Sequence, residues 1–142
     1  MNEEIIAKAA AFAVATRNCV LAQLDDGGYP HAATITPSKT EGIGRIYFGT
    51  GAGSSWARRA ANCGRSCVCF TSDRPEINVT LVGNMEVVTD DLDLKKELWR
   101  DWMPQYWSGP DDPDFVVLRF STRRYSLYME GEQARGTLRE EE

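Results

Sequence analysis

The sequence predicts a single α+β domain, mainly β, in which about seven short antiparallel strands form a barrel or a sandwich. Two observations support this prediction. Short β-branched and aromatic runs follow one another along the chain, and most are joined by turns short enough for hairpins. Helical periodicity is confined to a segment before the first strand and to two insertions, so the strand–helix alternation of a parallel sheet is missing.

The first half of the chain is predicted to begin with a helix over residues 3–17. Apolar residues recur there at helical spacing, and two glutamates in the first turn suit the positive end of the helix dipole. The turn Asp25–Gly28 connects the first two strands as a hairpin. A short helix rich in alanine and arginine follows Ser55 and ends at about Asn62. The strands predicted in this half cover residues 18–24, 29–36 and 43–50.

The second half is predicted to hold four strands and one helix. Gly83 interrupts a long β-branched run and indicates a bulge where the sheet bends. A helix is predicted over residues 91–103, and Pro104 ends it. The last two strands are expected to be joined by residues 121–124. The strands predicted in this half cover residues 66–70, 77–89, 115–120 and 125–129.

Charge and hydropathy limit the partners. Lys and Arg number 16 against 21 Asp and Glu, which gives a net charge of −5 and argues against a nucleic-acid partner. No apolar run approaches the roughly 20 residues that span a bilayer, and no basic segment precedes the first apolar stretch, so we expect no membrane partner and a cytoplasmic protein. Residues 1–142 are expected to form one domain, in which residues 131–142 are a flexible acidic tail.

Three of the four cysteines lie within seven positions, at Cys63, Cys67 and Cys69. Cys67 and Cys69 are two apart in a predicted strand, so both side chains face the same side and do not readily form a disulfide with each other. The spacing lacks the paired Cys-x2-Cys knuckles of zinc sites, and the single histidine, His31, is far away in sequence. We therefore expect reduced packing cysteines and no metal site.

Two polar segments are candidates for a binding site. The glycine-rich junction Phe48–Ser55 leads into a helix, whose free backbone N–H groups and dipole suit an anion such as phosphate. The alternative is that Ser54 only caps the helix. The segment 34–39 offers two threonine hydroxyls, the Ser38 hydroxyl and the cation Lys39, although an ordinary strand exit explains the same residues.

A third candidate is an aromatic cluster after the predicted helix, which contains Trp99, Trp102, Tyr106 and Trp107. Trp99 and Trp102 are interpreted as packing residues, and Trp107, beyond the proline, as the better ligand contact. With one histidine and no prominent carboxylate pair, the sequence predicts no catalytic side chain. A cofactor would therefore supply any chemistry.

These features together resemble the general-stress-protein-26 branch of the pyridoxamine 5′-phosphate oxidase-like superfamily, the FMN-binding split barrels. The resemblance runs from about Asn18 to Gly131. It implies a split antiparallel β-barrel of about six to seven strands with flanking helices. It also implies a homodimer with composite FMN sites. The stretches that carry it are Gly28–Pro30, Ile46–Ser54, Val79–Asp90, Glu97–Trp102, Gly109–Pro113 and Val116–Phe120.

The resemblance also implies the roles of individual residues. Residues 34–36 would line the edge of the flavin ring, Lys39 would approach the phosphate, and Thr50 and Ser54 would donate to the phosphate or ribityl chain. Asn78 and Trp107 would reach the flavin of the partner subunit. Where many members have a lysine, this chain has Trp56. The cofactor-binding residues expected in this way are Thr34, Ile35, Thr36, Ser38, Lys39, Thr50, Ser54, Ser55, Asn78 and Trp107.

The function implied by the resemblance is an FMN-dependent oxidoreductase that acts on a small molecule. The segment after Gly131 lacks the tryptophan and the basic ending with which pyridoxamine-phosphate oxidases hold their substrate, so that activity is not expected. A flavin-binding sensor or store without catalysis, and a structural dimer without cofactor, remain alternatives. A deazaflavin is a further ligand that related barrels accept, and the single histidine makes haem a poor candidate.

Overall fold

The computed structural model describes residues 2–139 and contains one curved antiparallel sheet of eight strands. The strand order is β2-β1-β5-β6-β7-β4-β3, and β8 pairs with the other half of β7. The predicted fold class, mainly β and antiparallel with flanking helices, is confirmed. The strands are β1 (Cys19–Leu24), β2 (Pro30–Ile35), β3 (Lys39–Glu41), β4 (Arg45–Gly51), β5 (Arg65–Ser72), β6 (Ile77–Val88), β7 (Phe115–Met129) and β8 (Glu132–Thr137).

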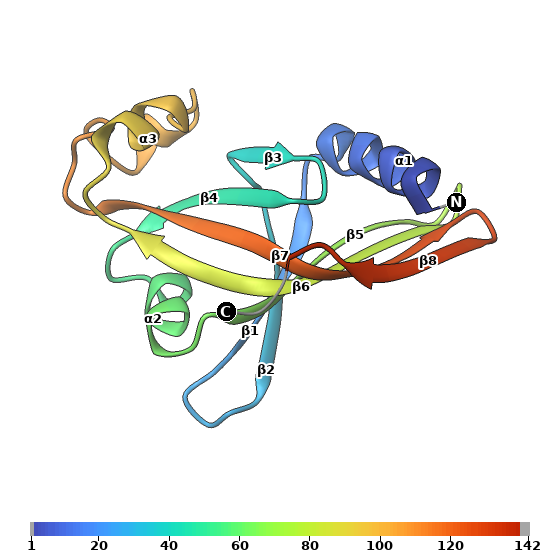
Figure 1. The fold of residues 1–142 in the computed structure, drawn as a ribbon. Coiled ribbons are helices and arrows are strands. Elements are labelled where there is room, and N and C mark those ends of the chain that lie inside the picture. The colour runs from blue at the N-terminus through green and yellow to red at the C-terminus, as the bar shows by residue number, and fades with distance from the viewer. Residues whose placement is uncertain (1, 140–142) are drawn as a thin grey trace.

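Three α-helices and one 3-10 turn flank the sheet, and α1 and α3 lie at opposite ends of the long strands β6 and β7 (Figure 1). Helix α1 packs against β3, β7 and β8. No helix among residues 2–139 is long and apolar enough to cross a membrane. The helices are α1 (Asn2–Ala15), α2 (Ser55–Asn62) and α3 (Leu92–Glu97), and the 3-10 turn η1 covers Met103–Gln105.

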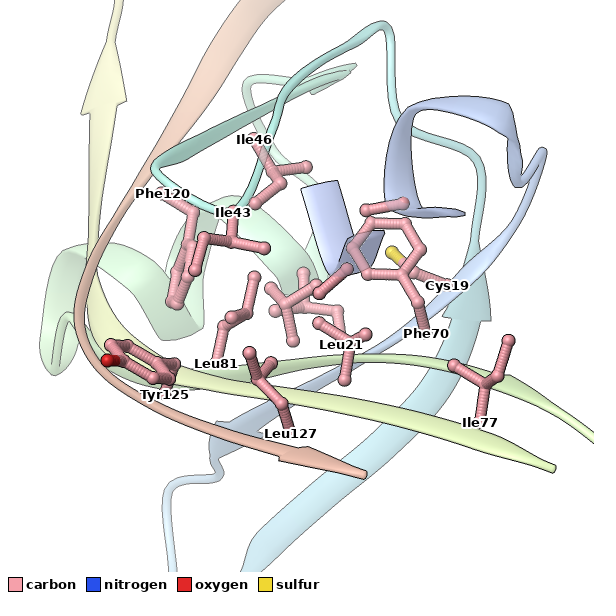
Figure 2. Packing of buried hydrophobic residues seen from close by; sticks show 14 of the residues in the cluster. Cys19, Leu21, Ile43, Ile46, Phe70, Ile77, Leu81, Phe120, Tyr125 and Leu127 are labelled. Atoms are coloured by element: carbon pink, nitrogen blue, oxygen red, sulfur yellow. The ribbon is translucent and has the colours of Figure 1, made fainter. Parts of the chain in front are cut away.

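Alternating side chains of the curved sheet fill its inner face and form the main core. Burial alternates along β1, β5 and β6, as the period of two in a strand requires. Figure 2 shows side chains from distant strands, among them Leu21, Phe70, Leu81 and Phe120, pointing into one shared space. All four are fully buried.

A second, smaller cluster lies beneath α3 and η1. It contains Tyr47, Leu98, Met103, Trp107 and Phe115, with Val117 beside them. Because Ile46 and Phe48 enter the main core while Tyr47 enters this one, both faces of β4 are covered. The second cluster thereby fixes the segment after α3 against the end of β4.

Strand β7 is continuous, and the predicted break at residues 121–124 is wrong. These residues pair with β6, where the register shifts between Val82 and Gly83, so the strand bends without ending. Thr122 is fully buried, and its Oγ1 donates to the carbonyl of Ile43 at 2.6 Å. Because this buried hydroxyl has a hydrogen-bond partner within the fold, the polar residues 121–124 can remain part of a strand. The predicted bulge at Gly83 is confirmed.

The expected flexible tail contains a strand, so that expectation is wrong for residues 132–137. Glu130 and Gly131 adopt φ values of 51° and 96°, the left-handed conformation that a tight hairpin requires, and return the chain onto β7. Ala134 is buried on the inner face of β8. The remainder of the expected tail, residues 140–142, lies outside the described residues.

The predicted helix over 91–103 is also shorter, since α3 ends at Glu97. The guanidinium of Arg100 donates to the carbonyls of Ser38, Glu97 and Trp99 at 2.8–3.0 Å. These bonds satisfy carbonyls that a continuing helix would use, and they attach the segment to the β2–β3 connection.

Gly83→Ala should lower the free energy of unfolding by about 1–3 kcal/mol, the usual cost of overpacking. A Cβ at residue 83 would lie 2.1 Å from the carbonyl oxygen of Ser121, which is backbone and cannot rotate away. Gly53→Ala is the matched control, because a Cβ there meets nothing within 4 Å. Urea denaturation measures both variants, and equal stability of the two would contradict the close approach at the bulge.

Candidate functional site

A cavity lined by aromatic rings lies where β2 and β4 end, α2 begins and η1 passes. Its volume is about 350 Å³. We call it the aromatic pocket. It brings together four residues that the sequence nominated and four that it did not. The lining residues are Ile35, Thr36, Gly49, Thr50, Trp56, Trp102, Tyr106 and Trp107.

A larger concavity, of about 440 Å³, lies against β6, β7 and β8 and is bordered by Arg124 and Arg135. None of the nominated residues lines it. Size alone does not identify a site, and ligand pockets are mostly apolar with a few placed polar groups. The aromatic pocket combines aromatic rings with two threonine hydroxyls and contains the nominated residues, so we take it as the candidate site.

The start of α2 forms one edge of the pocket. Ser54 is the N-cap, and its Oγ accepts from the backbone N–H of Ala57 at 3.1 Å. Thr50 Oγ1 donates to the same Ser54 oxygen at 2.9 Å. Ser54 therefore has the capping role that was the alternative to ligand binding, and Thr50 is the residue that reaches the pocket. Ser55 is exposed at the first helical position and does not line the pocket.

The opposite wall is a series of tilted and edge-on aromatic rings. The ring centroids of Trp102 and Tyr106 are 6.5 Å apart, those of Tyr106 and Trp107 are 5.5 Å apart, and those of Trp107 and Phe115 are 5.0 Å apart. Trp107 is only 9% exposed, and its Nε1 donates to Asp114 Oδ2 at 3.2 Å. These contacts hold the indole edge of Trp107 at the pocket.

Gly49 allows this wall to approach β4. A Cβ at this position would lie 2.8 Å from Phe115 Cε1 and 2.9 Å from Met103 Cε. Neither distance is compatible with a side chain. Because Gly49 has no side chain, the aromatic segment can pack directly against β4.

Trp56, the third wall, is held from behind by Arg59. The guanidinium lies 5.0 Å from the centroid of the indole, within cation–π range. Arg59 is 7% exposed and its Nε donates to Gln23 Oε1 at 3.0 Å, while Gln23 Nε2 donates to the Trp56 carbonyl at 3.1 Å. This network fixes the indole and points the Arg59 charge into the protein. On another side, the His31 ring lies edge-on to Trp56 at 6.4 Å.

Lys39 is not among the lining residues. Its Nζ lies 2.5 Å from Glu97 Oε2 and 3.2 Å from Glu41 Oε2, and the hydrogen bonds to Glu97 and then Glu41 raise its pKa. The neighbouring Ser38 is buried, and its Oγ has no hydrogen-bond partner among the described residues. The structure therefore places Lys39, which was predicted to approach a phosphate, against Glu97 of α3.

Two further nominated residues lie elsewhere on the sheet. Thr34 is exposed on β2 and pairs with Val20 of β1. Asn78 is exposed near the start of β6, where its Oδ1 accepts from Thr80 Oγ1 at 2.6 Å. The resemblance assigns Asn78 to the partner's site, whereas Trp107, which it also assigned to the partner, lines the pocket of its own chain.

Sequence reasoning missed Gly49, Trp102 and Tyr106 as lining residues, and it treated Trp56 as a departure from the family pattern. The clustering of Trp102, Tyr106 and Trp107 was the available signal. Trp102 packs against the second core, as predicted, and in addition lines the pocket.

The cysteines lie away from the pocket and are all reduced among the described residues. No three His, Cys, Asp or Glu side chains within residues 2–139 come together as a metal site. Cys67 and Cys69 project on the same side of β5, as predicted, and are half-buried. Hydrogen bonding from Cys67 lowers the pKa of the Cys69 thiol, and the same bond raises the pKa of Cys67.

We therefore expect Cys69 to react with iodoacetamide at pH 7 faster than an ordinary cysteine, because the thiolate is the nucleophile. Cys67→Ala should slow this reaction by removing the hydrogen bond that lowers the Cys69 pKa. Mass-spectrometric alkylation rates at several pH values measure the effect, with Cys63 as the internal reference. A Cys69 rate that Cys67→Ala leaves unchanged would contradict the coupling.

A curved antiparallel sheet of this topology, flanked by helices, defines a split-barrel fold. The chain belongs to the family described as "Pyridoxamine 5′-phosphate oxidase like", whose model matches residues 5–133. The resemblance stated from the sequence is thereby confirmed. No curated protein matches the sequence at a significant level.

Solved structures share the fold at low sequence identity. A Clostridium acetobutylicum protein related to general stress protein 26 aligns with a TM-score of 0.83 and 21% identity over 97% of both chains. A heme binding protein from Mycobacterium smegmatis aligns with a TM-score of 0.74 and 20% identity over 94% of this chain and 57% of the other. A pyridoxamine 5′-phosphate oxidase-related, FMN binding protein from Nostoc punctiforme aligns with a TM-score of 0.67 and 14% identity over 98% and 95%.

Proposed function

We propose that this protein binds a flavin, with the isoalloxazine ring in the aromatic pocket. The observation that carries this proposal is the pocket itself, a cavity of about 350 Å³ walled by Trp56, Trp102 and Trp107. Aromatic walls suit a planar ring. The Thr36 and Thr50 hydroxyls donate to Asn18 Oδ1 and Ser54 Oγ, and their remaining lone pairs can accept from the polar edge of such a ring. The FMN binding protein from Nostoc punctiforme, which shares the fold, supports the same ligand class.

FMN is the flavin that the family resemblance implies, and the residues present fit its ring. A bound flavin would supply redox chemistry. The described residues that line the pocket include no carboxylate, amine or imidazole and one phenol, that of Tyr106, so their main contribution is to bind and orient the ring. We propose an oxidoreductase that acts on a small molecule. Multiple turnovers of NAD(P)H with an added acceptor separate this function from a flavin store or sensor.

Fluorescence titration tests the binding proposal. Three of the four tryptophans line the pocket, so bound FMN or riboflavin should quench the tryptophan emission of the protein. The emission of the flavin should be quenched as well, because its ring lies against indoles. Haem is the comparison ligand, because the Mycobacterium smegmatis relative is named for it. His31→Ala should lower flavin affinity less than tenfold, because His31 contacts Trp56 from outside and does not line the pocket. If haem quenched the tryptophan emission, neither flavin did so, and His31→Ala abolished the effect of haem, haem binding would replace this proposal.

We also propose that two subunits complete the site. The outer face of β1, β5 and β6 is open and largely uncharged in one chain, with Val20 exposed at 36% and Cys67, Cys69 and Val82 nearby. A largely uncharged sheet face of this kind suits an interface between identical subunits. Association would shield Cys69, so the alkylation rates predicted above refer to protein dilute enough to be monomeric. Light scattering at micromolar concentration measures the association, and a monomer would argue against a composite site.

A further inference from the structure

We infer that the aromatic pocket recognises the ring of its flavin and not the phosphate, so that FMN and riboflavin bind with affinities within tenfold of each other. This inference rests on the proposed function and specifies its ligand class: a planar, uncharged tricyclic chromophore, of which riboflavin is the simplest probe. It departs from the phosphate-binding role that the resemblance implied for Lys39.

The first observation is the composition of the pocket. Its eight lining residues are apolar, aromatic or hydroxyl-bearing, and none within the described part of the chain is charged. A phosphate carries about two negative charges at neutral pH, and sites that select it supply cations or several converging N–H groups. The pocket supplies aromatic rings instead.

The second observation is that each cation near the pocket already has a partner. Lys39 pairs with Glu97 and Glu41. Arg59 is buried behind Trp56 and bonded to Gln23. Arg58 lies 3.8 Å from Asp26, on the side of the β1–β2 turn. Lys39 would have to leave two carboxylates to reach a phosphate, and the energy of these partly exposed pairs would be subtracted from its gain on binding.

Arg100, on the segment between α3 and η1, is also occupied. Its guanidinium donates to three backbone carbonyls, those of Ser38, Glu97 and Trp99. These bonds hold the segment that carries Trp102. Releasing Arg100 toward a ligand would therefore loosen the aromatic wall.

The start of α2 is the one phosphate-favouring feature that remains. The dipole of a helix at an exposed end adds a factor of roughly two to five to the affinity for an anion. The Ser54 hydroxyl already bonds Ala57 N and Thr50 Oγ1, so it adds little to this. A charge-assisted bond from a cation would instead contribute about ten- to a hundredfold. The difference is measurable.

The test compares wild-type protein titrated with FMN and with riboflavin, by fluorescence and by calorimetry. We expect dissociation constants within tenfold. FMN binding more than tenfold tighter overturns this inference and leaves flavin binding intact. Binding of neither flavin overturns both the inference and the proposed function.

Two variants at residue 56 test where the phosphate group of bound FMN lies. Trp56→Lys and Trp56→Gln lose the same ring contact, and only the first adds a cation beside the start of α2. The ratio of riboflavin to FMN dissociation constants should be at least about tenfold higher in Trp56→Lys than in Trp56→Gln. Equal ratios would overturn the placement of the phosphate end at α2.

Discussion

Phe120→Ala is expected to lower the free energy of unfolding by about 3–5 kcal/mol, the range measured for large aromatic truncations in cores. Phe120 is fully buried and pairs with Ile46 on one side and Met85 on the other, at the centre of β7. Its ring points into the space that Ile43 and Ile46 share (Figure 2). Neighbouring strands are fixed by backbone hydrogen bonds, so the cavity left behind cannot collapse.

Phe120→Leu is the matched control, because it keeps an apolar side chain in the same place and leaves a smaller cavity. Its destabilisation should be less than half that of Phe120→Ala in urea or thermal unfolding. A loss below about 1 kcal/mol for Phe120→Ala would mean that β7 rearranges, and that the continuous strand is not the centre of the core.

The strands that alternate strongly in polarity were predictable from the sequence, and those formed by tertiary contacts were not. Residues 19–24 and 77–88 have the period of two that one buried face imposes. Residues 121–124 read as a polar loop, because the partner of the buried Thr122 hydroxyl, the carbonyl of Ile43, lies 79 residues away. Strand β8 could not be predicted for a similar reason, since only Ala134 of its six residues is buried and the sequence shows no alternation.

The candidate site was predicted in part for the same reason. Ile35, Thr36 and Thr50 line one cavity, since they end strands at one edge of the sheet. Trp107, which the resemblance assigned to the partner's flavin, lines the same cavity of its own chain. Lys39 was expected to face the phosphate, but its orientation depends on Glu97, which is 58 residues away. Trp56 stands where many family members have a lysine, and in this chain it forms a wall of the aromatic pocket. Its role depends on Arg59 and Gln23, which no local pattern connects.

Thr36→Trp is expected to weaken flavin binding by at least about a hundredfold, which corresponds to about 2.7 kcal/mol. Thr36 lines the aromatic pocket at the end of β2 and is only half-buried, so an indole can enter the cavity without disturbing either core. The new ring would occupy the volume that the isoalloxazine needs. Thermal unfolding should show that the variant stays folded, and fluorescence titration measures the loss of binding.

Thr34→Trp is the matched control and also decides between two placements of the site. Both positions were expected to line the flavin from the resemblance, but Thr34 is an exposed residue outside the aromatic pocket. Thr34 is paired with Val20 and so faces the proposed subunit interface, and light scattering must therefore first show that Thr34→Trp keeps the wild-type association state. A ligand held in the pocket should then bind Thr34→Trp with nearly wild-type affinity and be excluded only by Thr36→Trp. Equal losses in both variants would move the flavin to the exposed face of β2. Loss in Thr34→Trp alone would mean that the aromatic pocket is not where the ring binds.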